Sequence, residues 1–226
     1  MGLGISNLAL VRFLVRRRAR VTVLDQKPAG ELAPRLEELA GWPVRTVLGP
    51  GYLDVLAEGF DVVFLTPGIP KHLPQVEEAR RQGATVSGEI PLFLELCPAP
   101  VVGITGSAGK TTASTLVARM LETSGYRVYL GGNIGQPLID RVDEIPPAAR
   151  VVLELSSFQL ELAGRSPHVG VLLNLLPDHM DVHSSWEEYV AAKRRVFLYQ
   201  GKGDPALCSH VLLRSEEHTS ELQSHV

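Results

Sequence analysis

The chain alternates between short apolar runs and longer stretches in which apolar residues have helical spacing. Runs rich in β-branched and other apolar residues predict strands at residues 20–25, 61–66, 84–87, 101–105, 127–130, 151–155 and 169–174. Helical spacing predicts helices at residues 72–82, 88–96, 110–124 and about 185–199. Because strands that alternate with helices are typical of parallel sheets, the pattern predicts an α/β fold.

A run of breaker residues divides this pattern in two. Cys97-Pro98-Ala99-Pro100 ends the first series, and the next predicted strand begins at Val101. We therefore predict one domain over residues 1–97 and a second over residues 98–213. From residue 214 the composition turns abruptly polar and rich in Ser, Glu and His, which predicts a disordered or non-native tail over residues 214–226.

Composition and charge exclude several classes of protein. With 226 residues, 45% hydrophobic and 21% charged, the chain is typical of a soluble globular protein. Its two cysteines form neither a disulfide framework nor a metal-ligand spacing, which favours a reducing compartment. A net charge of −3 argues against a nucleic-acid partner, and no apolar run has the length of a membrane span. The expected setting is the cytoplasm, with no membrane partner.

A glycine-rich loop between a predicted strand and a predicted helix is the strongest local signal. Its sequence is Gly106-Ser107-Ala108-Gly109-Lys110-Thr111-Thr112. Such a loop turns backbone N–H groups toward one anion, Lys110 can reach the terminal phosphates, and Thr111 can offer its hydroxyl to Mg²⁺. The P-loop pattern has glycine where this chain has Ile104, so a chance Gly-Lys-Thr at a helix start is the alternative. The strand before the loop favours phosphate binding.

Acidic and histidine residues lie at or just past the ends of two later strands of the second domain. Glu154 lies near the end of one strand, and Asp178-His179-Met180-Asp181 follows the other. Ligands gather at the carboxyl ends of parallel strands, so we expect Lys110, Glu154 and His179 to share one Mg²⁺-binding site. The alternatives are a structural ion pair for Glu154 and a loop-capping role for His179.

A second glycine loop lies at the N-terminus. Gly2-Leu3-Gly4-Ile5-Ser6-Asn7, with Asp25 at the end of the following strand, is similar to a dinucleotide fingerprint. Asn7 stands where the fingerprint has its third glycine, and no residues precede the loop to form its usual strand. Thr66-Pro67-Gly68-Ile69 ends a later strand and is expected at the same sheet edge. The site can be for NAD or for another nucleotide diphosphate.

Taken together, these motifs resemble those of the Mur ligases of bacterial peptidoglycan synthesis. The shared segments follow the family's order at residues 2–4, 66–69, 104–111, 131–135, 153–161, 174–181 and 191–193. The stretch Ser156-Ser157-Phe158-Gln159-Leu160-Glu161 matches the members that add D-glutamate. The resemblance covers about residues 1–205. It implies a Rossmann-like UDP-binding domain followed by an incomplete P-loop-type ATP-binding α/β domain, with the family's third domain missing and both ends truncated.

The resemblance also implies an activity. Family members of this branch are ATP- and Mg²⁺-dependent ligases that join D-glutamate to UDP-N-acetylmuramoyl-L-alanine through an acyl phosphate. The same resemblance implies a cytoplasmic, monomeric protein. Because the third domain binds D-glutamate, we expect no ligase turnover from the 226-residue chain itself.

Individual roles follow from matching motifs. Lys110 is implied to hold the β- and γ-phosphates, and the Mg²⁺ ligands are implied to be Thr111, Glu154, His179 and a carbamylated Lys193. By composition alone, the segment around Lys193 is only the basic face of a helix. Residues implied to line the muramoyl substrate or metal are Asn133, Ser156, Gln159 and His179. Those implied for the uridine-diphosphate pocket are Ile5, Ser6, Asp25, Thr66, Pro67 and Gly68.

Three other readings stay open at this point. A sister Mur ligase would share the ATP chemistry and add another amino acid. An NAD-linked oxidoreductase would use the N-terminal loop and leave Lys110, Glu154 and His179 unexplained. A non-catalytic nucleotide-binding fragment would use the second loop alone. Two departures from the family pattern bear on the site: Ala108 replaces a frequent polar residue, and Asn7 alters the first loop.

Overall fold

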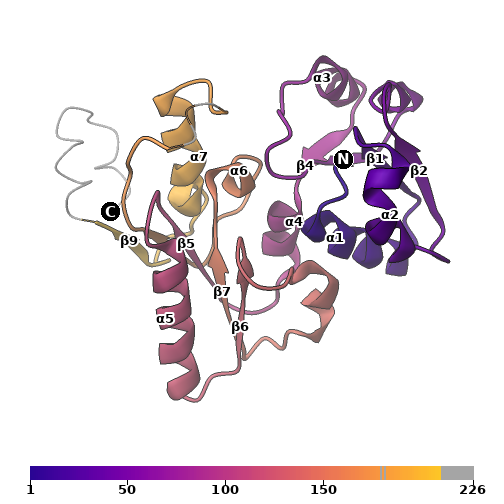
Figure 1. Cartoon of the computed structure of the whole chain (residues 1–226). Coiled ribbons are helices and arrows are strands. Elements are labelled where there is room, and N and C mark those ends of the chain that lie inside the picture. Colours follow the sequence, from indigo (N-terminus) through magenta and orange to yellow (C-terminus); the bar gives the residue numbers. More distant parts are fainter. Residues whose placement is uncertain (179, 181, 210–226) are drawn as a thin grey trace. The chain divides into compact units, whose positions relative to one another are not determined.

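The computed structural model describes residues 1–178, 180 and 182–209, and the predicted tail at 214–226 lies outside them. The chain forms two compact units (Figure 1). Unit 1 comprises Met1–Leu92 with Ile139–Arg141, and unit 2 comprises Phe93–Leu138 with the described residues from Val142 onward. No helix in the described part of the chain is long and apolar enough to cross a membrane.

Unit 1 contains two pairs of parallel strands. β1 (Val21–Asp25) pairs with β2 (Val44–Leu48), and β3 (Val62–Phe64) pairs with β4 (Thr85–Ser87). Its helical elements are α1 (Ile5–Arg16), α2 (Ala29–Glu37), η1 (Asp54–Glu58), α3 (Pro74–Arg81) and the start of α4 (Glu89–Leu96). Leu8 and Val11 of α1 pack with Val23 of β1 in a buried apolar cluster, which fixes α1 against the strand.

The first two residues bridge the two strand pairs of unit 1. The Gly2 N–H donates to the Leu24 carbonyl of β1 at 2.7 Å. The Met1 amino group donates to the Phe64 carbonyl of β3 at 2.6 Å, and Thr66 N–H donates to the Met1 carbonyl at 3.1 Å. Met1 and Gly2 therefore connect the ends of β1 and β3 through backbone hydrogen bonds.

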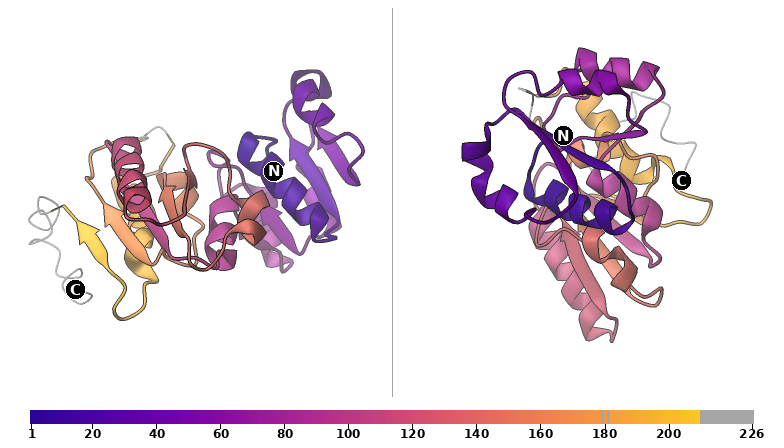
Figure 2. Two further views of the ribbon diagram at one scale, coloured as in Figure 1. Left: turned by 90° about the horizontal axis from the view of Figure 1, so that it is seen from below. Right: turned by 90° about the vertical axis from the view of Figure 1, so that its right-hand side faces the viewer.

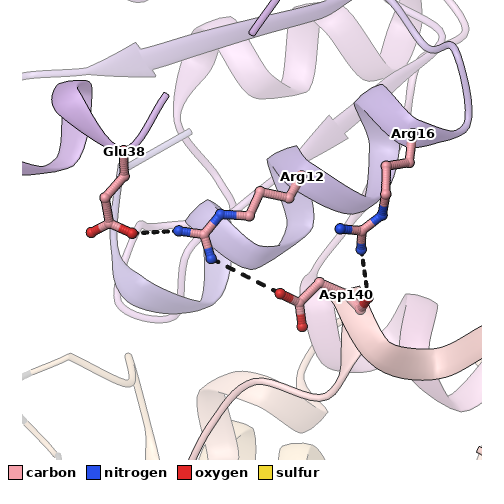
Figure 3. Close-up of polar contacts among 4 residues, drawn as sticks. All are labelled: Arg12, Arg16, Glu38 and Asp140. Atoms are coloured by element: carbon pink, nitrogen blue, oxygen red, sulfur yellow. Dashed lines mark hydrogen bonds and ion pairs between the residues drawn. The ribbon is translucent and has the colours of Figure 1, made fainter. Parts of the chain in front are cut away.

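The residues Ile139–Arg141 belong to unit 1 through charged contacts (Figure 3). They open the 3-10 helix η2 (Ile139–Glu144). The Asp140 carboxylate lies 4.0 Å from a guanidinium nitrogen of Arg12, and the Asp140 carbonyl accepts a hydrogen bond from Arg16. Arg12 also pairs with Glu38. These contacts attach a segment distant in sequence to the outer face of α1.

Unit 2 is built on a parallel sheet of five strands (Figure 2). The strands, in spatial order, are β6 (Val128–Gly132), β7 (Arg150–Glu154), β5 (Val101–Thr105), β8 (Val169–Leu172) and β9 (Ala206–Cys208). Side chains alternate across a strand, so Ile104 packs with Ala118 of α5 (Lys110–Thr123) while Thr105 faces α7 (Trp186–Leu198). The short helix α6 (Ser157–Leu160) follows β7.

The predicted strands are all present, and each begins within one residue of its expected start. The sequence pattern missed the helical elements α1, α2, η1, η2 and α6 and the strands β2 and β9. The helix expected from residue 72 begins at Pro74, the first-turn position that proline favours. The prediction of an α/β fold with parallel sheets is confirmed.

Candidate functional site

The glycine loop of unit 2 connects β5 to α5 in a conformation that requires glycine. Gly106 has φ of 154°, and an added Cβ would lie 3.2 Å from the Leu173 Cβ atom. Gly109 caps α5 in the left-handed region, with φ of 80°, and α5 has no acidic residue in its first turn. The N–H groups that open a helix lack intrahelical partners and carry partial positive charge. This loop therefore has the backbone geometry of an anion-binding site.

Two lysines converge on the carbonyl of Gly106. The Lys110 ammonium donates to the carbonyls of Gly106 at 3.0 Å and Ser107 at 2.9 Å. Lys193, from α7, is 2% exposed and donates to the Gly106 carbonyl at 2.9 Å. Burial lowers the pKa of Lys193 to about 8; the Lys110 charge adds to this effect and Asp178 opposes it. A substantial fraction of the Lys193 amine is therefore uncharged at mildly alkaline pH.

Glu154 is buried at the end of β7 and is held by two predicted site residues. The Thr111 hydroxyl donates to one carboxylate oxygen at 2.7 Å, and the Asn133 side-chain amide donates to the other at 2.9 Å. Glu154 is only 2% exposed. A buried carboxylate is costly unless it has such donors or a cation. The structure thus brings Thr111, Asn133 and Glu154 together beside the glycine loop.

Two glycines explain how Asn133 reaches Glu154. An added Cβ at Gly132, where φ is 91°, would lie 2.1 Å from the Glu154 carbonyl oxygen. At Gly131 it would lie 2.7 Å from the Leu138 side chain. The chain leaving β6 therefore passes directly against β7, and Asn133 N–H donates to the Glu154 carbonyl at 2.8 Å.

Ser156 and Gln159 form a local capping arrangement at the start of α6. The Ser156 hydroxyl accepts from the Gln159 N–H at 3.2 Å, and the Gln159 side-chain oxygen accepts from the Ser156 N–H at 3.0 Å. This is a capping box, and it fixes the turn that follows Glu154. The side chains of Ser156 and Gln159 are therefore hydrogen bonded within this turn.

The predicted ligand His179 lies outside the described residues. A different group that could hold a metal ion is present among the residues that the structure does describe: Glu161, His183 and Glu188 have ligand atoms within 4.8 Å of one another. His183 is hydrogen bonded to the Ser157 hydroxyl at 2.9 Å, and the Glu188 carboxylate accepts from the Ser184 N–H at 2.8 Å. The hydrogen bonds of His183 and Glu188 therefore stabilise α6 and the start of α7.

Asp25 and Asn7 shape the N-terminal glycine loop of unit 1. The Asp25 carboxylate accepts from the Leu3 N–H at 2.7 Å and the Lys27 N–H at 2.9 Å. The Asn7 side-chain amide donates to the Gly2 carbonyl at 2.8 Å and the Thr66 hydroxyl at 2.7 Å. Asn7, which departs from the dinucleotide fingerprint, thus connects two of the predicted segments.

The remaining residues predicted for the uridine-diphosphate pocket either belong to this loop or belong to the segment of Thr66, which contacts the loop. Ile5 is 68% exposed at the first position of α1, which has no acidic residue in its first turn. Thr66 contacts Gly2 so closely that an added Cβ there would lie 2.7 Å from the Thr66 hydroxyl oxygen. Ser6 is half-buried, and Pro67 and Gly68 are exposed. The N-terminus of α1 is therefore accessible beside Thr66.

Models of two known protein domains match this chain. The Mur ligase middle domain matches residues 104–225, and the Mur ligase MurD-like N-terminal domain matches residues 1–88. The UDP-N-acetylmuramoylalanine–D-glutamate ligase of Symbiobacterium thermophilum is 56% identical over 204 residues, which are 90% of this chain and 45% of that protein. The enzyme of the same name from Acetivibrio thermocellus is 46% identical, with 90% and 44% covered. The chain thus spans less than half the length of these relatives.

A solved structure shows the same fold. The UDP-N-acetylmuramate:L-alanyl-γ-D-glutamyl-meso-diaminopimelate ligase of Neisseria meningitides superposes with a TM-score of 0.59 at 19% identity. The match covers 95% of this chain and 72% of the other. At this identity the likeness concerns the fold alone.

Proposed function

Because the chain belongs to the Mur ligase family, we propose that it forms the nucleotide- and magnesium-binding part of an ATP-dependent ligase that adds D-glutamate to UDP-N-acetylmuramoyl-L-alanine. The choice of substrate rests on the relatives of that name. The observation that carries the nucleotide site is the convergence of Thr111 and Glu154 beside the loop that holds Lys110. Soluble nucleotide substrates of this kind are consistent with a cytoplasmic protein.

The proposed reaction has two steps. A carboxylate oxygen of the L-alanine residue attacks the γ-phosphorus of ATP, and the bond from that phosphorus to the ADP oxygen breaks. The amine of D-glutamate then attacks the acyl carbon, phosphate leaves with the bonding electrons, and the amine loses a proton. Both steps need alignment of reactants and neutralisation of phosphate charge more than covalent help from the protein.

Lys110 is proposed to supply positive charge to the terminal phosphates. Its ammonium donates to the Gly106 and Ser107 carbonyls, within the loop whose last residues open α5. A phosphate oxygen is a stronger acceptor for an ammonium group than a neutral carbonyl. We therefore propose that Lys110 exchanges these carbonyls for phosphate oxygens when ATP binds.

The residues beside the loop fit Mg²⁺. Glu154 and Thr111 present a carboxylate and a hydroxyl oxygen 2.7 Å apart, and Mg²⁺ prefers oxygen ligands. Bound Mg²⁺ would neutralise phosphate charge. We propose Thr111, Glu154 and His179 as its holders, with Asn133 keeping the Glu154 carboxylate in place. Lys193 would join them after carbamylation, since its uncharged amine can add CO2 and so become an anion.

The N-terminal loop of unit 1 is proposed to bind the uridine diphosphate. The N-terminus of α1, with exposed Ile5 and half-buried Ser6, would face the diphosphate, and Thr66, Pro67 and Gly68 would border it. Asp25 would act by holding the loop, because both its carboxylate oxygens accept backbone N–H groups. Ser156 and Gln159 would border the muramoyl group through the turn they cap.

Calorimetric titration of the 226-residue chain with MgATP tests the proposal. We expect saturable binding that Lys110→Ala weakens at least tenfold, while Ala at the exposed Lys202 leaves it unchanged. Lack of binding, or equal binding by Lys110→Ala, would refute the nucleotide site. Separate titrations with UDP and with NADH test the N-terminal loop. We expect the chain to bind UDP and not NADH; binding of NADH and not of UDP would favour an oxidoreductase.

A further inference from the structure

Asn174 is bonded to the glycine loop through both ends of its side-chain amide. It follows β8, which pairs with β5, and so lies beside the loop that leaves β5. Its side-chain oxygen accepts from the N–H groups of Ser107 at 3.0 Å and Ala108 at 2.9 Å. Its side-chain nitrogen donates to the Ala108 carbonyl at 3.0 Å. Each polar atom of the side chain therefore has a loop partner.

These bonds divide the loop into two halves. Two successive N–H groups that point at one oxygen form the kind of concavity that binds anions, and here a neutral side chain fills it. The amides of Ser107 and Ala108 are thus directed at Asn174. The amides left for a phosphate are those of residues 109–112, which precede the first intrahelical bond of α5, from the Ala113 N–H to the Gly109 carbonyl.

The first half of the loop is held from a second side as well. The Ser107 hydroxyl lies 2.8 Å from the Tyr189 hydroxyl of α7 and donates to the Leu176 carbonyl at 2.9 Å. Tyr189 is fully buried, and its ring lies 4.7 Å from the Lys193 ammonium. Ser107 and Ala108 are therefore hydrogen bonded to the segments around them, while the second half of the loop contains its one charged residue, Lys110.

We propose that Asn174 is a positioning residue for nucleotide binding, which holds the first half of the loop so that the amides from Gly109 onward face the phosphates. This inference rests on the proposed function, in which the loop binds ATP. The chemistry explains why the residue is an amide. Aspartate could accept from both N–H groups, but it could not donate to the Ala108 carbonyl and would place a negative charge beside the phosphates.

The test compares MgATP, AMP and inorganic triphosphate as calorimetric probes of the 226-residue chain. We expect Asn174→Ala to weaken MgATP and triphosphate binding about tenfold, since the loop loses three bonds and its fixed shape. Asn174→Asp should weaken ATP more than AMP, because repulsion grows with phosphate charge. Hydrogen exchange at the Ser107 and Ala108 amides should accelerate in Asn174→Ala and not in Asn174→Asp, whatever the nucleotide affinity.

Gln200→Ala is the matched control. The Gln200 side chain donates three hydrogen bonds to backbone carbonyls, those of Pro167, His168 and Pro205, in the same unit but away from the loop. Gln200→Ala should leave the affinity for nucleotides and the hydrogen exchange of the Ser107 and Ala108 amides unchanged. If wild type binds MgATP and both Asn174 variants bind it with the affinity of wild type, the positioning role is wrong and the proposed function stands. If wild type binds neither MgATP nor triphosphate, both are wrong.

Discussion

The Thr111 hydroxyl donates a 2.7 Å hydrogen bond to the Glu154 carboxylate and so joins the first turn of α5 to the end of β7. The two residues are 43 positions apart in the sequence. Their contact exists because β5, which leads into α5, is paired with β7. It places an oxygen pair suited to Mg²⁺ at the edge of the sheet where the glycine loop turns.

Replacing Glu154 by Gln should remove the dependence of ATP binding on Mg²⁺. The amide has nearly the same shape and can still accept from Thr111, but it lacks the negative charge that attracts the cation. We expect MgATP binding to weaken about tenfold, with metal-free ATP binding unchanged or slightly stronger. Titrations in Mg²⁺ and in EDTA measure both values. A Glu154→Gln chain that keeps the full Mg²⁺ effect would contradict a metal role for Glu154.

Gly132→Ala should destabilise unit 2 strongly. The new Cβ would lie 2.1 Å from the Glu154 carbonyl oxygen, and φ of 91° is strained for alanine. We expect a loss of about 3 kcal/mol or more in the free energy of unfolding, measured with urea. Gly125→Ala is the control, because its φ of 87° is similar but an added Cβ has nothing within 4 Å. It should cost about 1 kcal/mol. Equal losses would show that backbone strain, not the contact, decides.

Lys193 should form a carbamate in a pH-dependent way. Burial, with help from Lys110, lowers its pKa to about 8, so the reactive uncharged amine becomes abundant near that pH. In ¹³C-bicarbonate we expect one slowly exchanging carbamate signal that increases as pH is raised toward 8. The signal should be absent in Lys193→Ala and present in Lys202→Ala. A signal that survives Lys193→Ala belongs to another amine.

Glu89 should make unit 1 less stable as pH rises. The residue is buried, and one of its carboxylate oxygens has no hydrogen-bond partner among the residues that the structure describes. Burial raises its pKa from 4.5 to about 7, with Asp140 adding to the shift and the Ile139 N–H opposing it. Since the folded-state pKa is raised, the protonated form contributes stability that is complete below pH 4.5 and is lost as pH rises through 7.

Glu89→Gln should remove this dependence. As pH rises from 4.5 to 7.5, the free energy of unfolding of wild type should fall by about 3 kcal/mol relative to that of the variant. This is the energy that corresponds to a pKa shift of this size. Urea unfolding of both proteins across this range gives the difference directly. Glu95→Gln, at an exposed position of the same helix, is the control. Parallel curves for wild type and Glu89→Gln would rule out an effect of Glu89 ionisation.

The site illustrates which residues a local pattern can identify. The sequence predicts Glu154 as a site residue because it ends an apolar strand, and Lys110 because it closes the glycine loop that follows another; strand ends share one edge of a parallel sheet. Gly131 and Gly132 belong to a segment that the sequence shares with the family. The structure explains why glycine is needed there, because β6 passes close against β7. Asn174 and Tyr189 were missed as site residues, since an asparagine after a strand and a tyrosine in a helix are common anywhere.

The sequence by itself determined the family, the α/β class, the succession of most strands along the chain and the position of the glycine loop of unit 2, because apolar periodicity and glycine motifs are local properties. Only the tertiary structure decided that Asn174 accepts from the amides of residues 107 and 108, that Lys110 and Lys193 share the Gly106 carbonyl, and that Asp25 and Asn7 hold the first loop. Hydrogen bonds between distant residues depend on which strands become neighbours. In this chain the order β6-β7-β5-β8, which no short sequence window contains, sets those contacts of unit 2.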